Sequence, residues 1–191
     1  MKRPMPAKFK GIAVRSNDPV VSERSQGRVL RQLYLGKPSA RPVVIDLSAL
    51  TMLRTPAGEE LVVPWLRSNA KTAGHRIPVA IKTYSPVARE TVADALRRSG
   101  EVAYWLPSEP GVPQLIGSYN EADMHLLDTV REAGGTITLD PQNPVAAVDE
   151  TDLERLTAEG ILERVQTGEK VEYKDPFIGI TADNTSYAIS A

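Results

Sequence analysis

The sequence of 191 residues contains no cysteine. Disulfide bonds, thiolate nucleophiles and thiolate metal ligands are therefore excluded. No stretch approaches the roughly 20 apolar residues that a bilayer span requires, so we expect no membrane partner. The first six residues also lack the apolar core of a secretory signal. These absences are compatible with a cytoplasmic protein, which is the location that we expect.

Motifs that carry catalysis are missing as well. The two histidines, His75 and His125, lie outside any metal-binding spacing such as H-E-x-x-H. The sequence has no phosphate-binding loop, dinucleotide-binding glycine motif or nucleophile elbow. Glu59 and Glu60 are adjacent, so they point to different sides of a helix and are interpreted as a solvated face. We therefore predict no catalytic residue, no metal and no cofactor, and a protein that is not an enzyme.

The composition is that of a folded protein, but its charges are unevenly distributed. Hydrophobic residues make up 41% of the chain and charged residues 25%, with a formal net charge of −1. Residues 1–100 hold 18 basic and 7 acidic residues, a balance of +11, and residues 101–191 hold 5 and 17, a balance of −12. Opposite fields can help two parts of one chain, or two copies, to dock. Alternatively, the basic half faces an anionic partner such as nucleic acid.

Strand and helix patterns alternate through the first half of the chain. Strands are expected at 9–14, 43–47, 77–81 and 102–106, and helices at 22–36, 55–74 and 85–100. Val29, Leu30 and Leu33 repeat at helical spacing in the first helix, and Pro64 is expected to bend the second. This alternation favours an α/β fold with a mostly parallel sheet flanked by helices.

Local signals add detail to this pattern. Ser22, Thr55 and Ser85 are expected as helix N-caps, because a hydroxyl can accept a hydrogen bond from the free amides of a first turn. The run Val43–Leu47 is interrupted by one carboxylate, that of Asp46. Such a run is typical of a central strand in a sheet that is covered on both faces.

The second half of the chain has a different order of predicted elements. A proline-rich segment at 107–118 is interpreted as a linker. Beyond it, helices are predicted to begin behind Asn120 and behind Asp149. Strands are expected at 136–139, 161–165, 170–173, 177–180 and 187–189, the last two within a C-terminal tail of residues 177–191.

Three short motifs in residues 8–106 resemble those of a known family. They are Ser22-Glu23-Arg24-Ser25-Gln26, then Val43 to Ser48, then a helix carrying Glu59-Glu60-Leu61. This series resembles STAS domains and is most similar to a bacterial STAS-like group of unassigned activity. The resemblance implies a small α/β sandwich with helices against a sheet. It also implies regulated protein–protein contact rather than bond-making chemistry.

Phospho-switched members of the family carry an acceptor serine at the start of the helix that follows the aspartate-ending strand. In this sequence Arg54 falls where the family has an acidic residue, and Thr55 or Pro56 falls where it has the serine. A phosphate on Thr55 would lie at a helix N-terminus, where free amides favour an anion. The favoured interpretation of Thr55 is a simple N-cap, and that of Asp46 is a turn or cap former, with a site residue as the alternative.

The acidic half, residues 119–176, weakly resembles a winged-helix module. A winged helix that binds DNA needs Lys and Arg on its recognition helix and wing. Residues 149–155 instead hold four carboxylates and one arginine. In the predicted hairpin, Glu163, Glu169, Glu172 and Asp175 outnumber the basic residues, which are Arg164, Lys170 and Lys174. The pattern therefore favours a unit that docks to protein or dimerises.

These observations predict a regulatory or adaptor protein that acts through protein–protein contact or self-association. Its candidate interaction residues are Arg24, Arg28, Arg31, Asp46, Thr55 and Glu59. The alternative is a nucleic-acid-associated transcriptional regulator, with Arg97, Arg98, Arg164, Lys170 and Lys174 as phosphate contacts. Arg24, Arg28 and Arg31 recur at i, i+4 and i+7 and share one helix face, which fits an anionic partner or an ordinary solvated surface.

Overall fold

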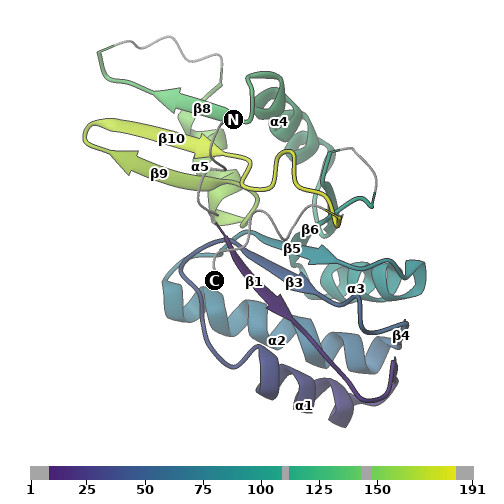
Figure 1. Ribbon diagram of the computed structural model, residues 1–191. Helices are drawn as coiled ribbons and strands as arrows, with labels where there is room; N and C mark the ends of the chain where they lie inside the picture. The colour runs from purple at the N-terminus through teal and green to yellow at the C-terminus, as the bar shows by residue number, and fades with distance from the viewer. Residues whose placement is uncertain (1–8, 109–111, 143–147, 184–191) are drawn as a thin grey trace, which may run out of the picture.

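A five-stranded sheet forms the centre of the molecule (Figure 1). The computed structural model describes residues 9–108, 112–142 and 148–183. The strands, in spatial order, are β1 (Lys10–Ala13), β3 (Val43–Asp46), β5 (Val79–Lys82), β6 (Val102–Trp105) and β7 (Gln114–Gly117). The first four are parallel, and β7 runs antiparallel to β6. The predicted α/β class is confirmed.

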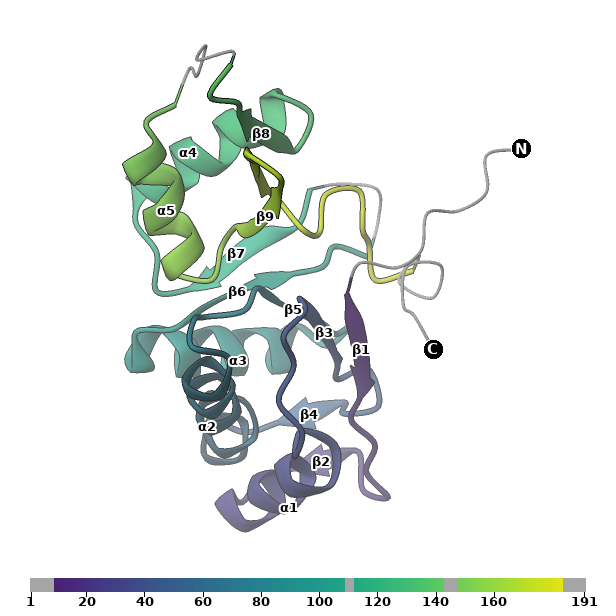
Figure 2. The same ribbon diagram turned by 90° about the vertical axis from the view of Figure 1, so that its left-hand side faces the viewer.

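Three helices cover one face of this sheet (Figure 2). They are α1 (Arg24–Tyr34), α2 (Thr55–Ala73) and α3 (Pro86–Ser99), and a small parallel pair, β2 (Val20–Val21) and β4 (Met52–Leu53), lies beside them. The parallel strands follow one another across the sheet in a single direction. Right-handed crossovers then place every connecting helix on the same side. This geometry creates the first hydrophobic core, which includes Ile45, Leu61, Ile81 and Leu96.

The acidic half covers the other face of the same sheet (Figures 1 and 2). Its elements are α4 (Glu121–Glu132), β8 (Thr136–Leu139), α5 (Glu150–Ala158), β9 (Glu163–Thr167) and β10 (Lys170–Lys174), and the three strands form an antiparallel sheet in the order β8-β10-β9. A second core joins the two halves, with Val44 and Tyr104 packed among Leu156, Tyr173 and Phe177. The prediction that Val43–Leu47 is covered on both faces is confirmed.

The segment predicted as a linker contains a strand. Residues Gln114–Gly117 form β7, the outermost strand of the sheet beside β6. Pro113 directly precedes the strand, and only Leu115 and Ile116 are strongly apolar, so the local pattern is too short to indicate it. The sheet domain therefore extends beyond residue 106.

Two further expectations fall in the C-terminal tail. Phe177–Ile180 is a turn and not a strand. Phe177 is fully buried, with its ring centroid 5.2 Å from that of Tyr104 and 5.7 Å from that of Phe9. Its apolar character therefore reflects burial in the shared core. The strand expected at 187–189 lies outside the described residues.

The predicted helix caps are confirmed at three positions and wrong at two. The side chains of Ser85, Asn120 and Asp149 accept hydrogen bonds from the first-turn amides of α3, α4 and α5. In α2, Arg54 occupies the N-cap position and Thr55 is already helical. In α1 the N-cap position belongs to Glu23, whose amide donates to the Gln26 side chain in a capping box, so Ser22 is not the cap. Pro64 lies inside α2, which continues through it.

Candidate protein-interaction site on the helical layer

Helices α1 and α2 approach closely at a glycine. A Cβ atom on Gly27 would collide with the backbone carbonyl of Ala57 in α2, so only glycine permits this crossing. Gly27 and Leu30 are the buried residues of α1. The contact at Gly27 therefore determines which flank of α1 faces α2 and which flank faces outward.

An ion-pair network, which we call the arginine–glutamate cluster, links the three helices. It comprises Arg24, Arg31, Glu59, Glu60 and Arg98. The Glu59 carboxylate lies 3.2 Å from the Arg24 guanidinium and 3.1 Å from that of Arg98. The Glu60 carboxylate lies 3.5 Å from Arg24 and 3.3 Å from Arg31, which also donates to the Glu60 backbone carbonyl.

The cluster corrects the interpretation of Glu59 and Glu60 as a solvated helix face. The two glutamate side chains are only 24% and 21% exposed, because they lie between neighbouring helices. Arg24, Arg31 and Glu59 are thus brought together, as three of the six predicted interaction residues. Arg28 lies on the same helix, is exposed, and forms no ion pair with any residue that the structure describes.

The outward flank of α1 carries apolar side chains. Val29 is 52% exposed and Leu33, one turn further along the helix, is 68% exposed. The sequence pattern grouped both with Leu30, but only Leu30 is buried. Val29 also borders a groove of about 270 Å³ that is lined by Ser16, Val21, Ser25, Gln26, Val29 and Leu30. We call Val29, Leu33 and this groove the α1 face.

Asp46 and Thr55 form no ion pair with the cluster: Asp46 lies at the carboxyl end of β3, and Thr55 begins α2 one helical turn before Glu59. Asp46 ends β3, accepts a hydrogen bond from the amide of Ser48, and lies 3.7 Å from the ammonium of Lys82. Thr55 is the first residue of α2 and is half-buried. The Asp46 carboxylate therefore stabilises the turn after β3 and has an ionic partner in Lys82.

Tyr84 lies in the loop that follows β5, at the same end of the sheet. Its hydroxyl donates to a carboxylate oxygen of Asp183 at 2.7 Å. That hydrogen bond, partial burial and the negative charges of Asp183 and Asp46 raise the pKa of Tyr84 to about 12. The end of the described chain is thereby tied to the loop after β5.

The five cations listed above as phosphate contacts are paired within the described chain, whereas Arg28 of the arginine face on α1 is not. Their partners are Asp94 for Arg97, Glu59 for Arg98, Glu154 for Arg164, Asp140 for Lys170 and Glu172 for Lys174. They also lie on opposite sides of the central sheet, on α3 and on the β9–β10 hairpin (Figure 1). One nucleic-acid strand could not contact both groups through a single continuous patch.

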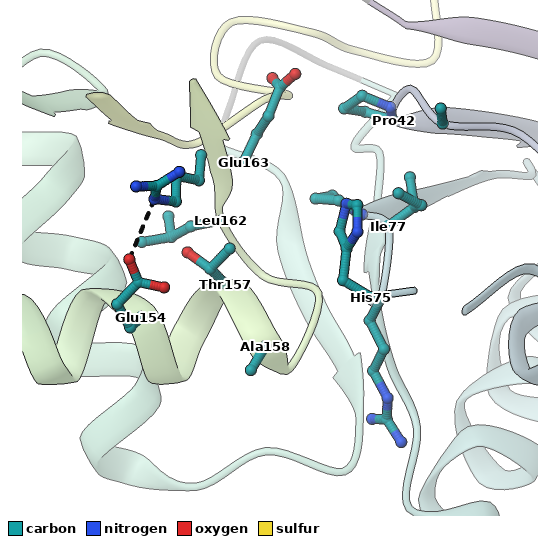
Figure 3. A pocket seen from close by; sticks show the side chains of 12 residues that line it. Pro42, His75, Ile77, Glu154, Thr157, Ala158, Leu162 and Glu163 are labelled. Carbon is teal, nitrogen blue, oxygen red and sulfur yellow. Dashed lines mark hydrogen bonds and ion pairs between the residues drawn. The ribbon is translucent and has the colours of Figure 1, made fainter. Parts of the chain in front are cut away.

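A cavity of about 400 Å³ lies where α5 and β9 meet the loops that precede β3 and β5. Figure 3 shows Glu154, Thr157 and Ala158 on one side and Pro42, His75 and Ile77 on the other. Glu154 is engaged by the Arg164 guanidinium at 3.2 Å and by the Tyr173 hydroxyl. Burial and the hydrogen bond to Glu154 raise the pKa of Tyr173 to about 12. The Glu154 carboxylate in the cavity wall therefore already has two partners within the chain, Arg164 and Tyr173.

Comparisons with protein-family models, curated proteins and solved structures found no match to this chain. Within residues 9–108, 112–142 and 148–183, no group of three or more His, Cys, Asp or Glu side chains could hold a metal ion. No helix in these ranges is both long enough and apolar enough to cross a membrane.

Proposed function

We propose that this chain is a non-enzymatic, cytoplasmic regulatory or adaptor protein that binds a partner protein through the α1 face. The observation that carries the proposal is the exposure of Val29 and Leu33 on a helix whose other flank is fully engaged. Contiguous exposed apolar surface marks sites of protein contact, and Val29 and Leu33 lie one helical turn apart on the same side of α1. The absence of cysteine fits a reducing compartment.

The chemistry of the α1 face indicates the kind of partner. An amphipathic helix could place its apolar side chains against Val29 and Leu33. Arg28 lies between Gly27 and Val29 in the sequence and has no ionic partner within the described chain. A carboxylate on the partner protein would supply the ionic partner that Arg28 lacks within the described chain. At the rim of an interface, such charge pairs contribute more to selectivity than to affinity.

Two further features support the proposal. The four parallel strands with three helices on one face are compatible with the STAS-like domain that the motifs around Ser22, Asp46 and Glu59 suggest. The order α4, β8, α5 and the β9–β10 hairpin is compatible with a winged-helix-like unit. Both resemblances favour contact between proteins over chemistry on a small molecule.

The ion pairs count against the nucleic-acid alternative. Phosphate binding depends on cations that are free to displace the counterions of a nucleic acid. Arg24, Arg31 and Arg98 already neutralise Glu59 and Glu60. Breaking this network would leave two half-buried carboxylates without partners, which opposes its use as a phosphate site.

The experiment compares proteins recovered from native cells with the wild-type chain, with Leu33→Asp and with Val112→Asp. Val112 is 51% exposed and lies next to β7, at the edge of the sheet opposite β1, which makes it a matched control. We expect a stoichiometric partner that is lost with Leu33→Asp and kept with Val112→Asp, and that binds the purified wild-type chain. A partner retained by all three, or no partner at all, would contradict the proposal. Thermal unfolding checks that both variants remain folded.

A further inference from the structure

Strand β7 leaves one edge of the central sheet open. It is the last strand in the sheet order, and no other strand of the described chain pairs with its outer side. The Ser118 amide donates to the Glu101 carbonyl at 2.8 Å, which continues the ladder between β7 and β6. Because backbone groups alternate in an antiparallel ladder, Leu115 and Gly117 direct their amides and carbonyls away from β6.

Strand β7 is only four residues long and follows Pro113, but within the strand itself no charge or proline protects the open edge. Natural edge strands are commonly shielded by lysine, proline or inward-pointing charges. The sequence of β7 is Gln-Leu-Ile-Gly, with no charged residue and no proline. Tyr119, just beyond the strand, is 43% exposed. The outward amides and carbonyls of such an edge can pair with a further strand.

A groove of about 480 Å³ runs between this edge and α3. Its helical wall is formed by Arg89, Glu90, Ala93 and Arg97. Arg89 is held in place over the ring of Trp105, at 4.0 Å from the ring centroid, and lies 3.4 Å from the Gln114 side chain. The groove is therefore built from a helix and a strand edge whose relative positions are secured.

The charges on the helical wall are self-complementary. Glu90 and Arg97 are seven residues apart, about two helical turns, so they lie on one face with the small Ala93 between them. Both are exposed, and Arg97 also pairs with Asp94 of its own helix. When two such helices meet antiparallel about a two-fold axis, each Glu90 lies opposite Arg97 of the second copy.

We propose that two copies of this chain associate through the α3–β7 edge. The β7 strands pair antiparallel through Leu115 and Gly117, so that the two five-stranded sheets become one continuous sheet. The α3 helices lie alongside each other, with the exposed Glu90 and Arg97 of one copy facing Arg97 and Glu90 of the other. A foreign peptide could use the same backbone groups, but Glu90 and Arg97 balance each other and would not select a charged peptide. The second copy is the occupant that these charges fit.

This surface is separate from the α1 face, so the two proposals can fail independently. The groove of the α1 face and the groove beside β7 have no lining residue in common. Leu33→Asp should therefore leave the dimer intact, and charge changes on α3 should leave partner binding intact.

The test is the molecular mass of the purified full-length chain by sedimentation equilibrium across a range of concentrations. We expect a monomer–dimer equilibrium that Glu90→Arg and Arg97→Glu each weaken by roughly tenfold or more, because each substitution opposes like charges twice across the two-fold axis. The double variant Glu90→Arg/Arg97→Glu restores the opposed pairs and should recover most of the association. Glu132→Arg, an equivalent change at an exposed position of α4, is the matched control and should have no effect.

A second readout is hydrogen exchange at the Leu115 and Gly117 amides, which should become slower as the concentration rises. A monomer at every concentration would overturn the proposal. A dimer that neither single variant weakens would place the interface elsewhere and would also overturn it. The double variant should remain folded by circular dichroism. If it is folded but does not recover association, the antiparallel arrangement is contradicted.

Discussion

The hydroxyl of Tyr104 in β6 donates a hydrogen bond of 2.6 Å to the backbone carbonyl of Ile161, which follows α5. Both residues are fully buried in the core that the basic and acidic halves share. The hydrogen bond therefore joins the halves within a largely apolar contact. The two parts of opposite net charge therefore share a hydrophobic core on one side of the sheet.

This relationship predicts a single cooperative unfolding transition. Tyr104→Phe leaves the Ile161 carbonyl buried without this donor, so we expect a loss of about 1–3 kcal/mol of stability. Chemical denaturation followed by tryptophan fluorescence and by far-ultraviolet circular dichroism should give coincident curves for both proteins. Two separate transitions in the wild-type chain would show that the halves unfold independently.

Gly27→Ala should be strongly destabilising. The added methyl group collides with the Ala57 carbonyl, and α1 must move away from α2. Overpacking of this kind costs about 1–3 kcal/mol, even though alanine is the better helix former. Gln32→Ala, at an exposed position of the same helix, is the control and should be neutral or slightly stabilising. Equal stability of the two variants would argue against a close crossing at Gly27.

Glu59→Gln should weaken the arginine–glutamate cluster. The substitution removes the charge that pairs with Arg24 and Arg98. Both arginines are more than half exposed, so we expect the loss to be about 1 kcal/mol or less. Because salt screens such pairs, the difference from wild type should shrink in 1 M NaCl relative to low salt. Glu121→Gln is a suitable control, because Glu121 is an exposed carboxylate in the first turn of α4. A loss that does not change with salt would indicate that packing, not charge, explains the role of Glu59.

Stability should fall at alkaline pH as tyrosines ionise. The folded pKa values of Tyr84 and Tyr173 are both raised from 10.0 to about 12. The unfolded chain therefore loses these protons first, and the contribution is complete below pH 10 and declines as the pH rises toward about 12. Absorbance of tyrosinate near 295 nm measures the titration, and Asp183→Asn should lower the pKa of Tyr84 toward its ordinary value. A titration of Tyr84 near pH 10 in the wild-type chain would contradict its hydrogen bond to Asp183.

Binding to duplex DNA should be absent or weak even at low salt. Arg97, Arg98, Arg164, Lys170 and Lys174 already have carboxylate partners within the described chain, which leaves Arg28 as the unpaired candidate. Fluorescence anisotropy with a labelled duplex should give a flat titration at 50 mM salt. Measurable affinity that falls steeply with rising salt, and that Arg28→Glu abolishes, would support the nucleic-acid alternative instead.

The alternation of strands and helices was predictable because each element has its own local period and boundary residues. Ser85, Asn120 and Asp149 mark their helices by hydrogen bonds made within a few residues. Strand β7 was not predictable in this way, because four residues behind Pro113 carry little periodic signal and the strand depends on pairing with β6.

The candidate site was predictable only in part. The arginines of α1 and the acidic pair of α2 stand out in the sequence, but Glu59 meets partners 35 and 39 residues away. The outward position of Val29 and Leu33 follows from the close crossing at Gly27, which is a tertiary contact. A glycine in the interior of an amphipathic helix was the available signal, since its cost there usually reflects packing.

The most direct measurement is site-specific photo-crosslinking in the native cell. A photoreactive residue replaces Leu33 in one sample and Val112 in another, and crosslinked products are identified by mass spectrometry. We predict one dominant protein adduct from position 33 and none of it from position 112. The absence of any protein adduct from position 33, or the same adducts from both positions, would contradict a partner bound at the α1 face.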